Sequence, residues 1–128
     1  MKFNDLFVAL NFQKISCSKE QLNRLETFMN VTLETNEKFN LTAITNPDDF
    51  VEKMIYDSAL ALYDLDLENK SLIDVGTGAG FPGMVIKILR PNANVTLLDS
   101  TAKKINHLLE FAKQQNIKVE GIANRAED

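Results

Sequence analysis

Apolar residues recur every three or four positions through the first half of the chain, a period typical of helices that bury one face. The pattern predicts a short first helix whose apolar positions are Phe3, Leu6, Phe7 and Leu10. After an interruption at 16–18 the period resumes and predicts a longer helix that ends near Lys38. A third helix is expected from about Pro47 to Tyr63.

Two of these helices carry sequence signals for their first residue. Ser18 followed three positions later by Gln21 is the pattern of a capping box, in which each side chain satisfies the backbone N–H of the other residue. Asn46 supplies an N-cap side chain, and Pro47 has a fixed φ that suits the first helical position. The segment 40–45 before them lacks the helical period and is predicted to be a loop.

The pattern changes near residue 70, where short apolar runs begin to alternate with helical stretches. Strands are predicted over three ranges, 71–75, 95–98 and 118–123. The helix after the first strand is stopped by Arg90-Pro91, and Ser100 or Thr101 is expected to cap the next one. Strands that alternate with helices at these lengths indicate a βαβαβ unit, which is a parallel sheet with right-handed crossovers.

The sequence therefore predicts two segments, a helical N-terminal extension (1–68) and the first half of a doubly wound α/β domain (69–128). Three strands make only half of such a sheet, and no later strand covers the open edge of the first. An uncovered apolar strand is prone to unwanted pairing. We therefore expect this chain to be a C-terminally truncated portion of a longer protein.

Composition and charge narrow the class of protein. The chain has 128 residues, of which 45% are hydrophobic and 25% charged, so one packed domain with at most a small appendage is expected. The net charge of -4 disfavours general affinity for nucleic acid, because the summed field repels phosphate. Residues 1–70 hold 7 basic and 12 acidic groups, whereas residues 71–128 hold 7 and 6. A site for an anionic ligand is therefore expected in the second half.

Cysteine content and the N-terminal sequence predict the compartment. Cys17 is the only cysteine, so an intrachain disulfide is excluded and a reducing compartment is the simplest interpretation. Asp5 comes before any apolar run long enough for a signal peptide, and no stretch is long enough to span a bilayer. We expect a cytoplasmic protein with no membrane partner.

Candidate ligand-binding residues follow each predicted strand, at the end of a parallel sheet where ligands bind. After the first strand, the glycines of Gly76-Thr77-Gly78-Ala79-Gly80 let the main chain turn sharply and approach a ligand. Asp99 ends the second strand and is placed to accept two hydrogen bonds from a ribose diol. Ala126-Glu127-Asp128, after the third strand, offers carboxyl or main-chain groups to an adenine edge. Together these residues predict an adenosine-containing ligand.

The glycines alone leave the kind of ligand open. Counted from Gly78, the spacing through Gly83 is G-x-G-x-x-G, the fingerprint of dinucleotide-binding proteins. That register begins two residues after the strand end and contains Pro82, which departs from the fingerprint. Both NAD and S-adenosylmethionine remain candidates on these residues, as does a tight turn that binds no ligand.

A set of motifs in order along nearly the whole chain resembles the RsmG (GidB) family of bacterial 16S rRNA guanine-N7 methyltransferases. The motifs are Asn40-Leu41-Thr42-Ala43-Ile44, Tyr56-Asp57-Ser58, the Asp74 to Gly83 loop, Arg90-Pro91, Leu97-Leu98-Asp99-Ser100 and Arg125-Ala126-Glu127. The resemblance implies a class I (Rossmann-like) methyltransferase fold, S-adenosylmethionine as cofactor, and 16S rRNA of the small ribosomal subunit as substrate. An NAD-dependent oxidoreductase fragment and a non-catalytic RNA- or ribosome-binding module are the alternatives.

The resemblance also implies particular cofactor contacts, namely Gly76, Phe81, Ala126 and Glu127, with Asp99 matching the acid that binds ribose in such folds. The full cofactor-binding set that we expect is Gly76, Gly78, Gly80, Phe81, Asp99, Ser100, Ala126 and Glu127. No metal and no catalytic side chain is expected, because guanine N7 has a free lone pair and methyl transfer to it needs mainly alignment.

The chain departs from the family pattern in two ways. It has Lys53-Met54 where the family usually has a basic residue and His, and the family continues through several more strands. Four basic residues are candidates for an RNA path, with an ordinary charged surface as the alternative: Lys87, Arg90, Lys103 and Lys104. His107 is expected to be a solvated helix residue. Phe81 either packs against the cofactor or fixes the helix start, and Asp74 either orients the loop or binds the ligand's amino group.

Overall fold

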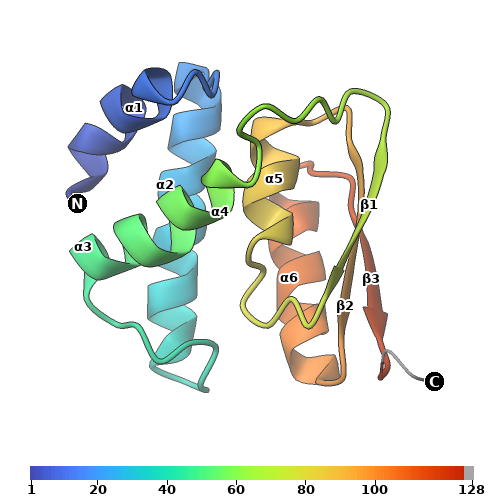
Figure 1. The fold of residues 1–128 in the computed structure, drawn as a ribbon. Coiled ribbons are helices and arrows are strands. Elements are labelled where there is room, and N and C mark those ends of the chain that lie inside the picture. The colour runs from blue at the N-terminus through green and yellow to red at the C-terminus, as the bar shows by residue number, and fades with distance from the viewer. Residues whose placement is uncertain (126–128) are drawn as a thin grey trace.

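The computed structural model describes residues 1–125, which form three layers (Figure 1). A sheet forms one outer layer, α5 and α6 lie in the middle, and the N-terminal helices form the other outer layer. None of the described helices is both long and apolar enough to cross a membrane. In chain order the elements are α1 (Phe3–Phe12), α2 (Lys19–Asn36), α3 (Pro47–Phe50), η1 (Val51–Tyr56), α4 (Asp57–Leu60), β1 (Ser71–Val75), α5 (Gly83–Leu89), β2 (Asn94–Asp99), α6 (Ala102–Gln114) and β3 (Glu120–Ala123).

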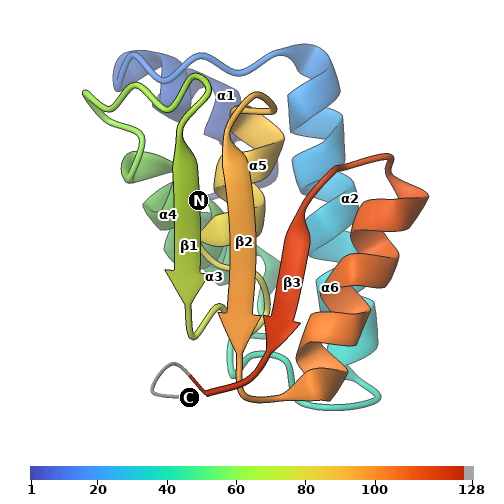
Figure 2. The ribbon, with the colours of Figure 1, turned by 90° about the vertical axis from the view of Figure 1, so that its right-hand side faces the viewer.

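The three strands form a parallel sheet in the order β1-β2-β3. Ser71 pairs with Asn94, and Thr96 pairs with Glu120. Because the strands are parallel, their carboxyl ends lie at one edge of the sheet, where the loops that follow them come together (Figure 2). The predicted α/β class with a parallel Rossmann-like sheet is confirmed, and β1 has the predicted bounds.

One face of this sheet is uncovered within residues 1–125. Side chains of each strand alternate between the two faces, and the inner face packs against α5 and α6. On the outer face Ile73 is 63% exposed, Val75 is 60% exposed and Ile122 is 47% exposed. The described part of the chain therefore has only one buried face of its sheet, unlike a parallel sheet with helices on both sides.

The N-terminal helices begin at the residues that the sequence indicates. Ser18 Oγ accepts the Gln21 N–H at 3.1 Å, and Gln21 Oε1 accepts the Ser18 N–H at 2.9 Å, which completes the predicted capping box. Asn46 Oδ1 accepts the N–H groups of Asp48 and Asp49 at 3.0 and 3.1 Å. Both caps satisfy N–H groups that have no partner inside a helix.

The third helix is continuous but not regular, and it ends three residues earlier than predicted, at Leu60 rather than Tyr63. Its middle section, η1, has π-helical hydrogen bonding. The Ser58 hydroxyl donates to the Met54 carbonyl one turn earlier, so this buried polar side chain is satisfied within the helix. Similarly, α2 ends at Asn36 instead of Lys38.

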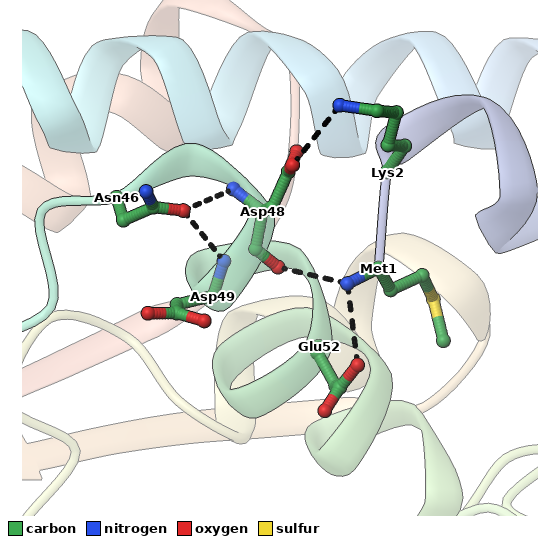
Figure 3. Close-up of polar contacts among 6 residues, drawn as sticks. All are labelled: Met1, Lys2, Asn46, Asp48, Asp49 and Glu52. Carbon is green, nitrogen blue, oxygen red and sulfur yellow. Dashed lines mark hydrogen bonds and ion pairs between the residues drawn. The ribbon is translucent and has the colours of Figure 1, made fainter.

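The chain's first residues attach α1 to the start of the third helix (Figure 3). The Met1 ammonium donates to Glu52 Oε1 at 3.2 Å and to the Asp48 carbonyl at 3.5 Å, and Lys2 Nζ donates to Asp48 Oδ2 at 3.2 Å. Exposed pairs of this kind contribute at most about 1 kcal/mol each. The fully buried Leu6 and Leu10 therefore hold α1 in place more strongly than these contacts.

Helix α5 is the centre of the fold, because all seven of its residues are buried. One side contacts β2, and the other sides contact α2 and α4. A helix that is buried on every side needs packing partners on every side. Here the N-terminal helices cover the sides of α5 that the sheet does not cover. The two segments thus share one hydrophobic core, while the division at residues 68 and 69 remains a prediction about the organisation of the sequence.

We predict that Gly83→Ala lowers the free energy of unfolding by about 1–3 kcal/mol, which is typical of overpacking. The added methyl would lie 2.4 Å from Leu97 Cδ2 and 2.8 Å from Asp74 Oδ2. The matched control is Gly76→Ala, where no atom lies within 4 Å of the new Cβ and only the strain of a φ of +72° remains, about 1 kcal/mol. Urea denaturation measures the free energy of unfolding of both variants. A larger decrease for Gly76→Ala than for Gly83→Ala would contradict this account.

Candidate functional site

The loop between β1 and α5 depends on glycine at alternate positions. Gly76, Gly78 and Gly80 have φ values of 72°, 57° and 104°, which side chains disfavour. The Leu98 carbonyl accepts the N–H of Gly76 at 2.8 Å and that of Thr77 at 3.0 Å, so the loop begins against the end of β2. The backbone at the end of β1 is therefore held in a fixed turn beside the neighbouring strand.

The Asp74 carboxylate closes this loop. Its Oδ2 accepts the Thr77 hydroxyl at 2.6 Å and the Gly83 N–H at 2.8 Å. The second contact satisfies an N–H at the start of α5 that has no partner inside the helix. Asp74 thus orients the loop, which is one of the two roles that its position in the sequence suggested.

The Asp99 carboxylate connects the glycine loop to α6. Oδ2 accepts the Gly78 N–H at 2.8 Å, and Oδ1 accepts the Thr101 N–H at 2.9 Å. Partial burial alone would raise the pKa of Asp99, but the hydrogen bonds from the Thr101 and Gly78 N–H groups and from the Thr101 side chain, with the nearby Lys104 charge, outweigh it and hold the pKa below its usual value. Asp99 is therefore ionised at neutral pH, and its carboxylate, which has about four lone-pair sites, can accept a further donor.

These ends of the strands enclose a cleft of about 310 Å³. Its lining residues follow or end the three strands and are Val75, Gly76, Leu98, Asp99, Ser100, Asn124 and Arg125. An added Cβ on Gly76 would meet no atom within 4 Å, so the cleft is open directly beside this glycine. The Asn124 N–H donates to the Asp99 carbonyl at 2.9 Å, which ties the end of β3 to the same place.

The structure brings four of the expected cofactor-binding residues together. Gly76, Asp99 and Ser100 line the cleft, and Gly78 contacts Asp99 through its N–H. Their assignment to a cofactor remains a prediction. Ala126 and Glu127 lie outside the described residues.

Gly80 and Phe81 face the helical layer instead of the cleft. A Cβ on Gly80 would lie 2.8 Å from Leu108 Cδ2. The Phe81 ring stacks on Phe28 with ring centroids 5.2 Å apart and meets Phe50 edge-on at 5.4 Å. In the described structure Gly80 therefore lets the loop pack closely against α6, and Phe81 fixes it to the N-terminal helices.

Besides the apolar Val75 and Leu98, two polar cleft residues, Asn124 and Arg125, are absent from the expected set. The signal that would have found them is their position, because they follow β3 directly and ligands bind beyond strand ends in parallel sheets. The predicted third strand has the correct last residue, Ala123, although it begins at Glu120 instead of Lys118.

Two of the four basic candidates for an RNA path are engaged within the fold. Lys87 is only 7% exposed and donates to the carbonyls of Pro91 and Ala93 at 2.8 and 2.6 Å. Burial, with a smaller effect of the Lys118 charge, lowers the pKa of Lys87. Arg90 donates to the Ser16 carbonyl at 3.0 Å and to its neighbour's carbonyl. These two side chains stabilise turns, and their place on an RNA path remains a prediction.

His107 is partly buried and Cys17 is buried. The predicted solvation of His107 holds only in part, because its ring lies edge-on to Phe39 at 6.2 Å and its Nε2 is buried with no hydrogen-bond partner among residues 1–125. Burial lowers the pKa of His107, which is therefore neutral at pH 7. Cys17 is buried, and burial raises the pKa of its thiol against the opposing charge of Arg90.

The fold and the cleft together define a class of protein. A parallel βαβαβ sheet with a glycine loop after the first strand and an acid at the end of the second is the Rossmann-like arrangement that places ligands beyond the strand ends.

Comparison with known proteins identifies the family within that class. The family described as rRNA small subunit methyltransferase G (GidB) matches residues 21–128. Several relatives carry the name ribosomal RNA small subunit methyltransferase G, among them the following three. The relative from Clostridium botulinum strain Alaska E43 is 45% identical over 131 residues, that from Mesoplasma florum 43% over 112 residues, and that from Mycoplasma capricolum 36% over 127 residues.

The chain belongs to the rRNA small subunit methyltransferase G family, which confirms the resemblance found in its motifs. The three matches cover 100%, 87% and 98% of this chain, respectively, and 55%, 47% and 55% of the relatives. The chain thus spans about half the length of these curated relatives.

We predict that Asp99→Asn removes an acid-sensitive part of the protein's stability. A carboxylate with a lowered folded-state pKa stabilises the protein above its unfolded-state pKa of about 3.9, and this contribution is lost as the pH falls through the folded-state pKa. The variant should therefore be less stable than the wild type at pH 7, and the difference should shrink below about pH 4.

Urea denaturation from pH 7 to pH 3 measures this difference in unfolding free energy. Asp64→Asn, at an exposed aspartate away from the cleft, is the control. A difference for Asp99→Asn that stays constant over the whole range would show that the carboxylate charge does not stabilise the loops.

Proposed function

We propose that this protein takes part in S-adenosylmethionine-dependent methyl transfer to N7 of a guanine in 16S rRNA of the small ribosomal subunit. The observation that carries the proposal is the ionised Asp99 carboxylate, held by two backbone N–H groups in a cleft beside Gly76. The names of its relatives, which are ribosomal RNA small subunit methyltransferases, support the same activity. A protein that modifies ribosomal RNA acts in the bacterial cytoplasm, in agreement with the predicted compartment.

The residues of the cleft fit the nucleoside part of such a cofactor. The Asp99 carboxylate has about four lone-pair sites, so beside its backbone N–H donors it can accept a ribose hydroxyl. The open space beside Gly76 lets a ligand approach the backbone closely. Ser100 and Asn124 add polar groups at the same edge, and a cleft of about 310 Å³ falls within the usual range of small-molecule sites.

The proposed chemistry asks little of the side chains. S-adenosylmethionine, when bound, supplies a methyl group on a positively charged sulfur. Guanine N7 offers a lone pair without losing a proton, so no general base is needed and alignment supplies most of the rate. The residues around Gly76 and Asp99 act by holding the cofactor, and the negative charge of Asp99 favours a cationic ligand in this cleft.

A dinucleotide is less well supported. In dinucleotide-binding proteins the N–H groups at the start of the first helix hold the pyrophosphate. Here the Gly83 N–H at the start of α5 already donates to Asp74 Oδ2, so this N–H is not free to hold a pyrophosphate. The NAD-dependent alternative therefore lacks the anion site that it needs in this loop.

We predict that S-adenosylmethionine binds this chain and that Asp99→Ala weakens the affinity at least about 10-fold, as expected for loss of hydrogen bonds to a charged group. Isothermal titration calorimetry measures the affinity. Asp99→Asn, which keeps an acceptor oxygen but removes the charge, should have an intermediate effect. Asp66→Ala, at an exposed aspartate on the polar connection before β1, is the control and should bind like the wild type.

A titration with NAD⁺ and NADH separates the two ligand classes. Tight binding of either, with none of S-adenosylmethionine, would favour the oxidoreductase alternative. Transfer of a tritiated methyl group to naked 16S rRNA and to small ribosomal subunits tests the reaction itself, with the C. botulinum relative as the positive control. Cofactor binding without RNA methylation would confine this chain's role to holding the cofactor.

A further inference from the structure

A second cleft lies at the same end of the molecule as the strand ends. It measures about 390 Å³ and is lined by Asn40, Leu41, Thr42, Ala43 and Lys104. The connection between α2 and α3 runs past the start of α6 at the end to which the strand arrows point (Figure 2). The cleft therefore forms where a loop of the helical segment meets the first turn of α6.

The loop that forms one wall of this cleft is held in a fixed conformation. Asn36 Oδ1 accepts the N–H groups of Leu41 and Thr42 at 2.7 and 3.0 Å, and Thr42 Oγ1 accepts the Ile44 N–H at 3.2 Å. Leu41 is only 5% exposed and anchors the loop in the interior. The loop is thus organised before any ligand binds, with the Asn40 side chain exposed to solvent.

The opposite wall is positively charged. Lys104 lines the cleft directly, and the Lys103 ammonium lies 4.4 Å from the centre of the Phe39 ring, a cation–π contact that holds it beside the loop. No ion pair within 4.0 Å involves either lysine among residues 1–125. Both ammonium groups are therefore available to an anion, in contrast to Lys87 and Arg90.

The two clefts are neighbours through α6. Asp99 and Ser100 line the first cleft, and Lys104, in the first turn of the helix that follows, lines the second. A strand of nucleic acid that passes over the second cleft would lie beside the first. This adjacency is what a base-modifying protein needs, because phosphate contacts fix the position of the strand while another pocket holds the reacting groups.

We propose that the cleft between the 40–43 loop and Lys104 binds the backbone of a single-stranded RNA segment next to the target base. Lys104 and Lys103 pair with phosphates, and the Asn40 and Thr42 side chains donate to phosphate or sugar oxygens. Single-stranded segments are the form of RNA whose bases can be turned out toward a pocket. This assignment rests on the proposed function, since it takes RNA as the substrate, and it names the residues that position it.

The test compares RNA affinities of matched variants of this chain. The probes are a short fluorescein-labelled single-stranded RNA, followed by fluorescence anisotropy, and naked 16S rRNA, followed by filter binding. Lys104→Gln and Asn40→Asp should each weaken binding about 3- to 10-fold, and Lys104→Gln should reduce the slope of log K against log salt by about 0.7. Both positions are partly or fully exposed, so the fold should tolerate these changes.

The controls repeat each change elsewhere on the surface. Lys113→Gln removes the same charge from the last turn of α6, and Asn23→Asp adds the same charge to the exposed surface of α2. Each control should change RNA affinity less than twofold. Equal effects at Lys104 and Lys113, or no measurable RNA binding by the wild type, would overturn the assignment of the cleft.

Calorimetry with S-adenosylmethionine on the wild-type protein keeps the two proposals distinguishable. If the cofactor binds but Lys104→Gln and Asn40→Asp leave RNA affinity at the level of their controls, the assignment of this cleft fails and the proposed function stands. If the variants weaken RNA binding as expected but the cofactor does not bind, the RNA cleft stands and the proposed methyl transfer fails.

Discussion

Two carboxylates at the ends of adjacent parallel strands determine the geometry of the candidate site. Asp74 accepts the Thr77 hydroxyl and the Gly83 N–H, and Asp99 accepts the N–H groups of Gly78 and Thr101. Hydrogen bonds to an ionised acceptor are roughly twice as strong as neutral ones. These four contacts connect β1, the glycine loop, the start of α5 and the start of α6. Because backbone groups are the main donors, the loop shape is set by the fold more than by the loop's own side chains.

The helical segment contributes to this geometry through α5. The sheet covers only one side of that helix, and its other sides are apolar as well. Without α2 and α4, these sides would face water, at a cost of about 1.5–3 kcal/mol for each large side chain exposed. Phe81 makes the connection more direct, since it follows the glycine loop and packs between Phe28 and Phe50. The N-terminal helices thus stabilise the conformation of a loop that lies far from them in the sequence.

Local signals in the sequence were enough to predict the strands, the α/β class, the two N-terminal caps and the cluster formed by Gly76, Gly78, Asp99 and Ser100. They work because a capping box, a strand-ending acid and a glycine turn involve residues within a few positions of each other or of a strand end. What the sequence does not reveal depends on contacts between distant elements. The His107 ring lies against Phe39, and Leu108 occupies the space beside Gly80, and periodicity shows neither contact. The π-helical turns of η1 likewise have no sequence signal that we recognise.

Burial and backbone hydrogen bonding also determine which positive charges remain available at the surface. To bind the proposed RNA substrate, an acidic chain must gather its available cations at one place, since its summed field is repulsive. Lys87 and Arg90 lie where turns leave carbonyl groups without partners, so their charges are used within the fold. Lys103 and Lys104 lie on the first turn of α6, where the carbonyl groups bond within the helix and do not compete for a cation. The start of α6, beside the strand ends, is therefore the part of the described surface best suited to attract phosphate.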